Sequence, residues 1–582
     1  MSAQAWPVAH ALAVYLAQNL GPIFPQAQLT AEQIQDMFTD PPNPELGDYA
    51  FPCFPLAKTL HQAPVAIAQK IAACLPAHDL VAKAQNAGPY VNFTISAAAL
   101  GELVVRPILQ GDFLRGNFVS PQRIMVEYSQ PNTHKVLHVG HMRNLCLGNA
   151  LVRILRYVGH QVIAATYPGD VGAHVAKCLW YLKNYNQEPI PATERGAWLG
   201  KIYTSATRLL DAHKEAGTDG EDKKIITQIL NELSAGKGEY YQLWQETRAW
   251  SLDLFHEAYR WAEIEFDHWY FESQFDASSL ALAKKYYAEG KYILSENAIG
   301  MDLSDQKLGF CMMIKSDGTG MYATKDIDLG QKKFADFDLD RSIYVVDKRQ
   351  AFHFKQIFAT LKKLGFKHAD DCYHLEYEFV ELPSGPMSSR AGNIIPLMDL
   401  VATLEKTIKE NYLNRYQGEW PPEEIERTAR LIANGAIKFG MCRLDNQRKI
   451  VFDMDAWAKL DGETGPYLQY VYARIASLAQ KVPPATGEID FTTLTLAAEK
   501  KLLAKLAHFN QVVAMCATQL KPSFLCAYLF DLGKIYNAFY TECPILKAPA
   551  QIQQARLALS LATQKVIGQG LELLGIHGPP RM

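Results

Sequence analysis

Residues 124–166 limit the fold of this 582-residue chain more than any other stretch. Residues 124–128 form an apolar run that predicts a buried strand, and apolar spacing from near His141 to just before Gly159 predicts a long helix. Residues 162–166 predict a second strand. A strand, a helix and a strand in this order favour a parallel, doubly wound α/β sheet. Ligands of such sheets lie at the carboxyl ends of the strands.

The turn between the first strand and the helix carries two histidines around a glycine. A helix start offers unpaired N–H groups and a partial positive charge, and both suit phosphate. Gly140 has no side chain to keep a nucleotide off the backbone, and His138 and His141 can donate hydrogen bonds to a reacting phosphate. Histidines with this spacing are more often structural, but Asn132, Lys135 and a second loop later in the chain favour a functional site.

The second loop follows the strand-like residues 379–382. Residues 383–393 contain glycines, serines and one arginine, among them Ser388, Ser389 and Arg390. Their N–H, hydroxyl and guanidinium groups can close on phosphate. Most loops of this composition are solvated turns, so this one supports a phosphate site only together with the histidine turn.

The composition is that of an ordinary globular protein, with 48% apolar and 20% charged residues. The length predicts roughly three or four domains. No apolar run reaches the roughly 18 residues that span a bilayer, and no basic segment with an apolar core opens the chain, so we expect a cytoplasmic protein without a membrane partner.

The ten cysteines form no C-x-x-C pair, which argues against zinc and disulfides. A net charge of −3 excludes a polycationic protein that binds DNA nonspecifically. An RNA partner would instead need local basic and aromatic patches.

Changes in pattern along the chain divide it into predicted domains. A small α/β module comes first; its Tyr49, Tyr90 and Phe93 could stack on bases, although core positions are favoured. A helical stretch interrupts the following α/β domain, whose strands resume at residues 309–314 and 342–346, and the remainder is nearly all helix. The predicted domains are 1–118, 119–395 with a helical insertion at about 175–290, 396–454 and 455–582.

These motifs, in this order and spacing, resemble those of the arginyl-tRNA synthetases, a family of class I aminoacyl-tRNA synthetases, over essentially the whole chain. His138-Val139-Gly140-His141 resembles the first class I signature, HIGH. The other similar segments are the arginine-specific lead-in at 127–132, the second signature (KMSKS) at 386–390, a tRNA-binding motif at 47–50, and anticodon-binding segments at 465–470 and 574–582.

The resemblance implies a Rossmann-like catalytic domain with a helical insertion, an N-terminal domain that binds tRNA and a helical anticodon-binding domain. It also implies the ATP-dependent attachment of L-arginine to tRNA(Arg) for protein synthesis, through arginyl-adenylate and with release of pyrophosphate and AMP. Positioning and charge stabilisation supply most of the acceleration in such displacements, so no protein nucleophile is required. Mg²⁺ is expected with ATP and zinc is not. A monomer that needs bound tRNA before it activates arginine is expected.

For ATP, the resemblance implies that His138 and His141 support the reacting phosphate and that Gly140 admits the adenosine. Ser388, Ser389 and Arg390 would hold the pyrophosphate. The chain departs from the family because Pro386 and Ser389 stand where KMSKS has lysines. Lys135 matches a lysine that many arginyl enzymes carry in compensation, so we expect it to act as a catalytic cation. The alternative is a surface lysine of the turn.

For arginine, a planar group with five N–H donors favours carboxylates with bidentate reach. Asp326 is expected to make the main guanidinium contact with Tyr322 beside it, although Asp326 could instead cap a helix and Tyr322 could be core. The remaining residues would fix the α-amino group and other polar atoms. The family positions map onto Glu127, Asn132, Tyr322, Asp326 and Gln350.

For tRNA, the resemblance implies contacts at both ends of the chain, with the N-terminal domain near the tRNA elbow and the C-terminal helices on the anticodon loop. Single-stranded bases are read by stacking and edge contacts, so Tyr470, Tyr540 and Met582 are candidates. For the two tyrosines a core position is an equal alternative. His174 stands where the family often has a glutamine, and its role stays open.

Two other functions compete with this interpretation. A cysteinyl enzyme would need zinc-ligand cysteines, and a glutamyl or glutaminyl enzyme would place a basic group, not Asp326, opposite its substrate. A synthetase-like RNA-binding protein without catalysis would explain the missing KMSKS lysines, but His138, Gly140, His141 and Lys135 argue against it.

Overall fold

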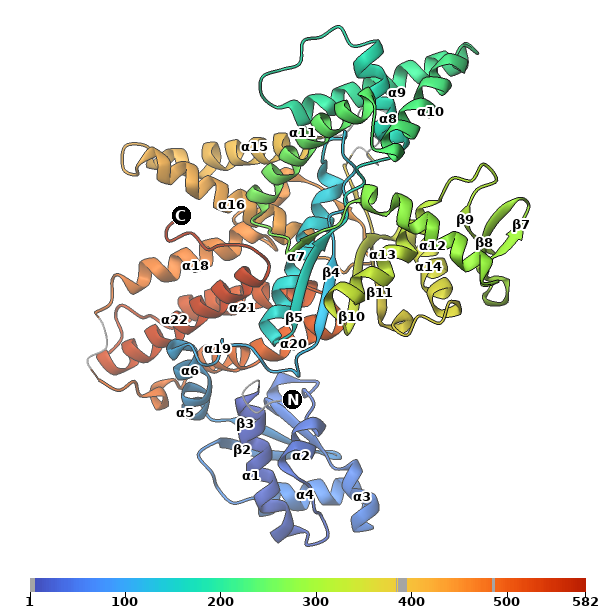
Figure 1. Ribbon diagram of the computed structural model, residues 1–582. Coiled ribbons are helices and arrows are strands. Elements are labelled where there is room, and N and C mark those ends of the chain that lie inside the picture. Colours follow the sequence, from blue (N-terminus) through green and yellow to red (C-terminus); the bar gives the residue numbers. More distant parts are fainter. Residues whose placement is uncertain (1–5, 384, 386–394, 484–486) are drawn as a thin grey trace.

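A five-stranded parallel sheet lies at the centre of the molecule (Figure 1). The computed structural model describes residues 6–383, 385, 395–483 and 487–582. The strand order is β11-β10-β4-β5-β6, and all neighbours are parallel. The strands are β4 (Arg123–Glu127), β5 (Gln161–Thr166), β6 (His268–Trp269), β10 (Arg341–Asp347) and β11 (Cys372–Tyr377). The chain leaves β4 toward β5 on one side and returns through β10 on the other, so the topological switch point lies between β4 and β10.

The α7 helix (Val139–Val158) connects β4 and β5, as the sequence predicted. It ends at Gly159, whose φ of 117° is a left-handed conformation that glycine adopts without strain. Gly148 lets α7 lie directly on the Tyr128 ring, where a Cβ would overlap it. The predicted strand–helix–strand unit is therefore confirmed, and it places the histidine turn at the carboxyl edge of the sheet.

The sheet is covered on both faces because its strands alternate between two cores. Ile124 and Val126 of β4 face one core with α7, and Met125 faces the other. That second core includes residues of α12 (Asp276–Ala288), α13 (Tyr322–Phe337) and α14 (Ala351–Lys363). Glu127, two residues after Met125, consequently points toward α13.

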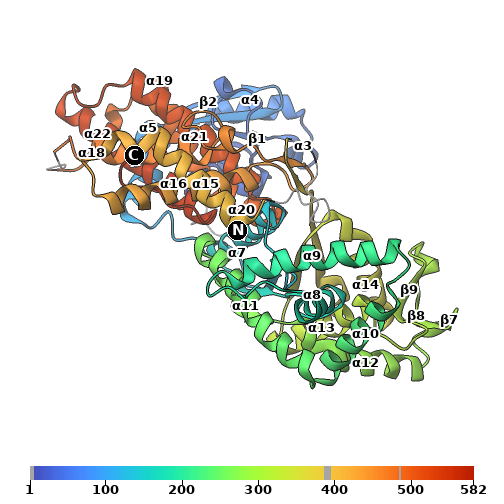
Figure 2. The same cartoon turned by 90° about the horizontal axis from the view of Figure 1, so that it is seen from above.

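The helical insertion was predicted at about 175–290, and its first part is helical as expected (Figure 2). It consists of α8 (Ala173–Asn184), α9 (Arg195–Glu215), α10 (Gly220–Ala235) and α11 (Glu239–Ala262). Within the predicted range, however, β6 joins the central sheet beside β5 and divides the insertion. A two-residue strand has no periodicity of its own, so the pattern could not reveal it.

The second part of the insertion follows β6 and has a different architecture. It contains η3 (Glu272–Phe275), α12 and an antiparallel sheet in the order β7-β8-β9, namely β7 (Ile293–Ser295), β8 (Ala298–Asp302) and β9 (Phe310–Ile314). The strand expected at residues 309–314 therefore exists but belongs to this small sheet. The catalytic strands resume only at β10, which is followed by η5 (Lys348–Gln350).

The N-terminal domain is a small α/β module, seen in blue in Figure 1. Its sheet has the order β1-β3-β2, and Phe93 of β3 is fully buried, as the core interpretation requires. The Tyr49 ring stacks on His508 of the C-terminal domain, with 6.1 Å between centroids. The elements are α1 (Pro7–Ile23), α2 (Ala31–Met37), η1 (Pro44–Leu46), β1 (Tyr49–Pro52), α3 (Phe54–Leu60), α4 (Pro64–Cys74), β2 (Val81–Ala87) and β3 (Tyr90–Ile95). They are followed by α5 (Ala97–Leu100), η2 (Gly101–Val105) and α6 (Arg106–Gln110), which pack against helices of the C-terminal part.

The C-terminal part is helical, as predicted, apart from a short ladder of β12 (Val380–Glu381) with β13 (Ile450–Val451). Its helices α16, α20 and α22 pack against α7. The helices are α15 (Leu397–Ile408), η7 (Lys409–Leu413), η8 (Asn414–Tyr416), α16 (Pro422–Cys442), α17 (Met454–Trp457), α18 (Gly465–Ala479), η9 (Phe491–Thr493), α19 (Ala497–Ala507), α20 (Phe509–Gln519), α21 (Ser523–Glu542) and α22 (Ala550–Leu573). In the described part of the chain, no helix combines the length and apolarity needed to cross a membrane.

Candidate functional site

Two loops meet at the carboxyl edge of the sheet, one after β4 and one after β5. Thr133 N–H donates to the Gly169 carbonyl at 2.9 Å, and Gly169 N–H donates to the Pro131 carbonyl at 3.1 Å. Gly169 is also tightly packed, since a Cβ there would overlap Asn132 Oδ1 and lie 3.2 Å from Glu272 Oε2. The backbone bonds hold Asn132 against the β5 loop, close to the switch point of the sheet.

The histidine turn forms the start of α7. His138 is the N-cap: its Nδ1 accepts from Gly140 N–H at 3.0 Å, while its own N–H donates to His141 Nδ1 at 3.1 Å. Both Nδ1 atoms are acceptors, so each neutral ring carries its proton on Nε2. Burial, with Arg349 and Lys135 nearby, lowers the pKa of His138 to about 4, and burial, His138 and Lys135 lower the pKa of His141 well below its usual value. At neutral pH the turn presents two uncharged N–H donors.

The end of the second loop is attached to the histidine turn. Leu397 N–H donates to the Leu137 carbonyl at 2.9 Å, and Pro396 forms a β-bridge with His138. The residues expected to hold pyrophosphate, Ser388, Ser389 and Arg390, lie outside the described residues, as does Pro386. The residues at the start of α15, shortly after the second signature in the sequence, are therefore bonded directly to the first signature.

Lys135 lies beside the histidine turn, half-buried between the sheet and the helical insertion. Its Nζ is 4.8 Å from the centroid of the Tyr203 ring of α9, a cation–π contact. Its charge contributes to the lowered pKa values of His138, His141 and His174. The ammonium therefore acts electrostatically on the histidine turn.

His134 is a positioning residue of the same turn that the sequence did not single out. It is fully buried, its φ is 61°, and its Nδ1 and Nε2 contact the hydroxyls of Thr133 at 3.0 Å and Thr247 at 2.8 Å. Its N–H donates to Ser251 Oγ at 2.9 Å. These bonds tie the turn to α11 and stabilise a backbone conformation that non-glycine residues rarely adopt.

Asp326 and Tyr322 lie on the first turns of α13. Asp326 does not cap the helix, because Met321 is the N-cap; its Oδ2 instead contacts His353 Nε2 of α14 at 2.6 Å. Burial lowers the pKa of His353, but the hydrogen bond and charge of Asp326 outweigh it, so the net shift is upward. Tyr322 is 63% exposed, so its core alternative is wrong.

The other expected arginine residues differ in how accessible they are. Asn132 and Gln350 are exposed, and Gln350 occupies the N-cap position of α14 without a side-chain capping bond. Glu127 is only 3% exposed. Its carboxylate forms an ion pair with the fully buried Lys333 of α13 and accepts from Gln130 Nε2 at 3.2 Å. In this arrangement Glu127 joins β4 to α13, and each of its carboxylate oxygens already contacts a protein group.

Two further carboxylates that the sequence analysis did not select complete an acidic group. Glu272 of η3 is 5% exposed and accepts from Lys325 Nζ at 2.9 Å; burial raises its pKa and Lys325 opposes that rise. Asp170 accepts from Arg248 Nε at 2.7 Å and from both the N–H and the hydroxyl of Ser273 at 2.8 Å. The place of Asp170 just after a predicted strand could have indicated it, whereas Glu272 follows a strand too short to predict.

His174, whose role the sequence left open, has a structural role in the β5 loop. Its Nε2 lies 3.2 Å from the Gly169 carbonyl, and burial with nearby Lys135 lowers its pKa to about 4. The neutral ring therefore donates from Nε2 and holds the β5 loop over the edge of the sheet.

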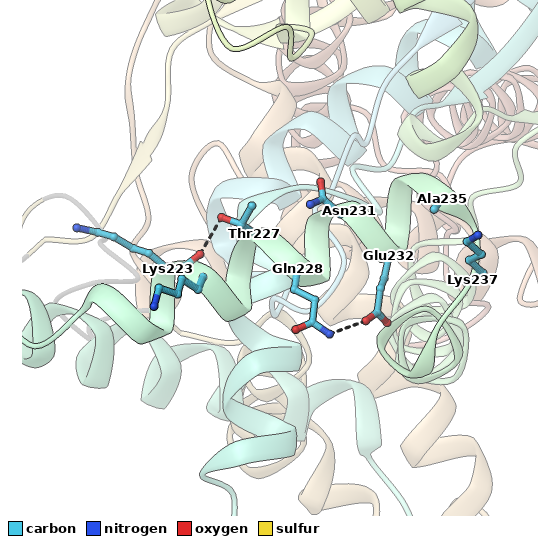
Figure 3. Close-up of a pocket in the computed structure, with 8 residues that line it drawn as sticks. Lys223, Thr227, Gln228, Asn231, Glu232, Ala235 and Lys237 are labelled. Carbon is cyan, nitrogen blue, oxygen red and sulfur yellow. Dashed lines mark hydrogen bonds between the residues drawn. The ribbon is translucent and has the colours of Figure 1, made fainter.

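A surface pocket in the helical insertion is separate from this site (Figure 3). It is formed by the side of α10 and by Lys237, with a Thr227–Lys223 bond and a Gln228–Glu232 bond along the helix. None of the expected site residues lines it.

Family profiles match nearly all of the chain. The tRNA synthetases class I (R) catalytic domain matches residues 104–454, the DALR anticodon binding domain matches 468–582, and the arginyl tRNA synthetase N terminal domain matches 10–95. An arginine–tRNA ligase of Bdellovibrio bacteriovorus is 50% identical over 97% of this chain and 98% of its own length. The chain belongs to the arginyl-tRNA synthetase family.

Solved structures agree with this membership. The arginyl-tRNA synthetase of Thermus thermophilus is 27% identical with a TM-score of 0.80, covering 98% of this chain and 99% of that one. The enzyme from Plasmodium falciparum has a TM-score of 0.75 at 19% identity, with 99% of both chains covered, which shows the shared fold. The class I catalytic fold, the N-terminal domain and the helical anticodon domain are therefore confirmed.

The candidate anticodon residues lie in different surroundings. Tyr470 is 37% exposed on α18. Tyr540 packs partly into the core under Arg474, whose guanidinium carbon is 4.0 Å from the ring centroid. Met582 is also packed against the core, and its carbonyl accepts from the Tyr416 hydroxyl at 3.4 Å. Tyr470 is the most accessible of the three for stacking on a base.

Proposed function

We propose that the carboxyl edge of the central sheet is where this arginyl-tRNA synthetase joins arginine to ATP and then passes the arginyl group to tRNA(Arg). One observation carries the proposal: the β4 loop that leads to two neutral histidine donors also holds Asn132 against Gly169, which lies next to Glu272 of the acidic group. Anionic phosphate suits the helix start, and a guanidinium suits the carboxylates.

For ATP, we propose that His138 and His141 donate from Nε2 to the reacting phosphate while the Gly140 backbone admits the nucleotide. Lys135 would contribute the positive charge that the second signature lacks. Ser388, Ser389 and Arg390 remain our prediction for the pyrophosphate. The neutral state of the histidines supports donation without a proton transfer, since the reaction moves no proton onto these rings.

For arginine, we propose that Asp326 receives the guanidinium, with Tyr322 beside it and Glu272 as an additional acceptor. Asn132 and Gln350 would orient the α-amino group, so that the α-carboxylate faces the α-phosphate of ATP. Glu127 would act through its ion pair with Lys333, which fixes the strand edge. In-line attack by the carboxylate then follows from positioning, without a protein nucleophile.

The remaining expectations extend the proposal to partners and conditions. Mg²⁺ would enter with ATP, because the phosphates supply the oxygen ligands that it prefers. The N-terminal and C-terminal domains would hold tRNA, with Tyr470 as the first candidate for the anticodon loop. A cytoplasmic monomer with domains at 1–118, 119–395, 396–454 and 455–582 remains our prediction.

The decisive experiment is aminoacylation of tRNA with each of the twenty amino acids, together with ATP–pyrophosphate exchange. We expect charging with arginine alone, and exchange only when tRNA(Arg) is present. Charging with another amino acid would refute the arginine assignment. Binding of tRNA without any exchange would support the non-catalytic alternative.

A further inference from the structure

Tyr167, the first residue after β5, has a buried hydroxyl for which no hydrogen-bond partner occurs in the described part of the chain. Its ring packs edge-on against Phe275 of η3, with 6.1 Å between centroids. A buried hydroxyl left without a partner loses its hydration and gains no hydrogen bond in return. Most buried polar groups are satisfied, so an orphan beside a functional site calls for an explanation.

The hydroxyl is surrounded by negative charge. Burial raises the pKa of Tyr167 well above its usual value, and the charges of Asp326, Glu272, Glu127 and Asp170 raise it further. These carboxylates come from α13, η3, β4 and the β5 loop. A carboxylate oxygen that is left without a partner in such surroundings favours a cation.

The carboxylates around Tyr167 differ in the oxygens that they leave available. Glu127 is occupied by Lys333 and Gln130, and Asp170 by Arg248 and Ser273. Asp326 uses Oδ2 for His353, and Glu272 uses Oε1 for Lys325. Within the described residues, Asp326 Oδ1 and Glu272 Oε2 have no such partner.

The five planar N–H donors of a guanidinium need several acceptors in different directions. We infer that the Tyr167 hydroxyl is a specificity-determining contact of the arginine site, where it accepts a hydrogen bond from the guanidinium beside Asp326 and Glu272. This inference rests on the proposed function, because it takes arginine as the substrate.

Tyr167→Phe tests the inference, since it removes the hydroxyl and keeps the ring against Phe275. We expect the KM for arginine in ATP–pyrophosphate exchange to rise by roughly tenfold, with kcat and the KM for ATP nearly unchanged. In thermal unfolding without ligand, the variant should be as stable as the wild type or more stable, because an unsatisfied hydroxyl is gone. The gain in Tm on adding arginine should be smaller than in the wild type.

Tyr128→Phe is the matched control. Its hydroxyl is also buried without a partner among the described residues, but its ring lies in the apolar core against Phe266, 4.7 Å between centroids. Its KM for arginine should be that of the wild type. An unchanged KM in Tyr167→Phe would overturn the inference, and so would equal losses of arginine and ATP binding. Failure of the wild type itself to charge tRNA with arginine would refute the proposed function instead.

Discussion

At the histidine turn, burial and the neighbouring cations Arg349 and Lys135 lower the pKa of His138 to about 4. The same residue caps α7 through Nδ1, so protonation there would remove an acceptor as well as add charge. The capping bond thus assigns the donor atom, Nε2, and burial assigns the neutral charge state. The protonation state of a side chain in this site depends on its burial and on neighbouring charges. Each role can be tested by a substitution that keeps the fold.

Lys135→Ala should reduce the rate of arginyl-adenylate formation by roughly 10²-fold, because it removes positive charge from a site whose second signature has no lysine. The Kd for tRNA should change little. The rate of ATP–pyrophosphate exchange measures adenylate formation, and a tRNA-binding titration measures the Kd for tRNA. Lys201→Ala, on an exposed position of α9, is the control and should behave as the wild type. Near-normal exchange in Lys135→Ala would refute the catalytic assignment.

Asp326→Asn should raise the KM for arginine by roughly tenfold or more, because a guanidinium loses a charged acceptor. Initial rates of exchange at varied arginine concentration provide the measurement. Asp338→Asn, at a fully exposed side chain just after α13, is the matched control and should leave the KM unchanged. An unaltered KM in Asp326→Asn would remove Asp326 from the pocket.

At the scale of elements, the site is made by loops that follow neighbouring parallel strands. The β4 loop and the β5 loop are bonded through Gly169, and the start of α15 is bonded to the histidine turn. Helices α11 and α13 then fix the loops from two sides, through His134 and through the Glu127–Lys333 pair. The position of each loop therefore depends on its partners as much as on its own strand.

Gly169→Ala should raise the KM for arginine and lower the Tm modestly, because the new methyl group overlaps Asn132 Oδ1 and approaches Glu272 Oε2. Exchange kinetics and thermal unfolding measure these effects. Gly220→Ala, at the start of α10, is the control, because a methyl group added there points into open space. Equal behaviour of the two variants would contradict the proposed contact between the loops.

At the scale of the whole molecule, the C-terminal tail connects the anticodon domain to the catalytic domain. Lys438 of α16 donates to the Gly575 carbonyl at 2.5 Å, and Gln469 of α18 donates to the His577 carbonyl at 2.7 Å. His577 also pairs with Glu263, after α11, at 2.5 Å and with Glu572 of α22 at 3.0 Å. One short segment therefore joins helices from three parts of the chain.

His577→Gln should destabilise the protein in a pH-dependent way. The hydrogen bonds to Glu263 and Glu572 raise the pKa of His577 from 6.5 to about 9. A raised pKa contributes stability that is full below pH 6.5 and is lost as the pH rises through about 9. The difference in the free energy of unfolding between wild type and variant should shrink across this window, as chemical denaturation at several pH values can measure. A difference that is constant with pH would contradict the ion pairs.

Local sequence patterns predicted several central elements of the fold and the family of this protein. Apolar spacing predicted β4, α7 and β5, and the motifs at residues 127–141 indicated both the family and the place of the nucleotide site, because strand periodicity and helix starts are properties of short segments. Domain architecture followed from the resemblance. Asn132, Tyr322, Asp326 and Gln350 were selected as arginine residues in the same way, and their individual roles remain predictions.

Only the tertiary structure decided which groups face one another. Glu127 pairs with Lys333, more than two hundred positions away, and Glu272 reaches the site because the two-residue β6 aligns beside β5. The unpartnered hydroxyl of Tyr167 is likewise a property of its packing. Such pairings depend on contacts between segments that are distant in the sequence. These contacts determine which groups are buried and which charges lie near them, and they produce no periodic pattern in the sequence.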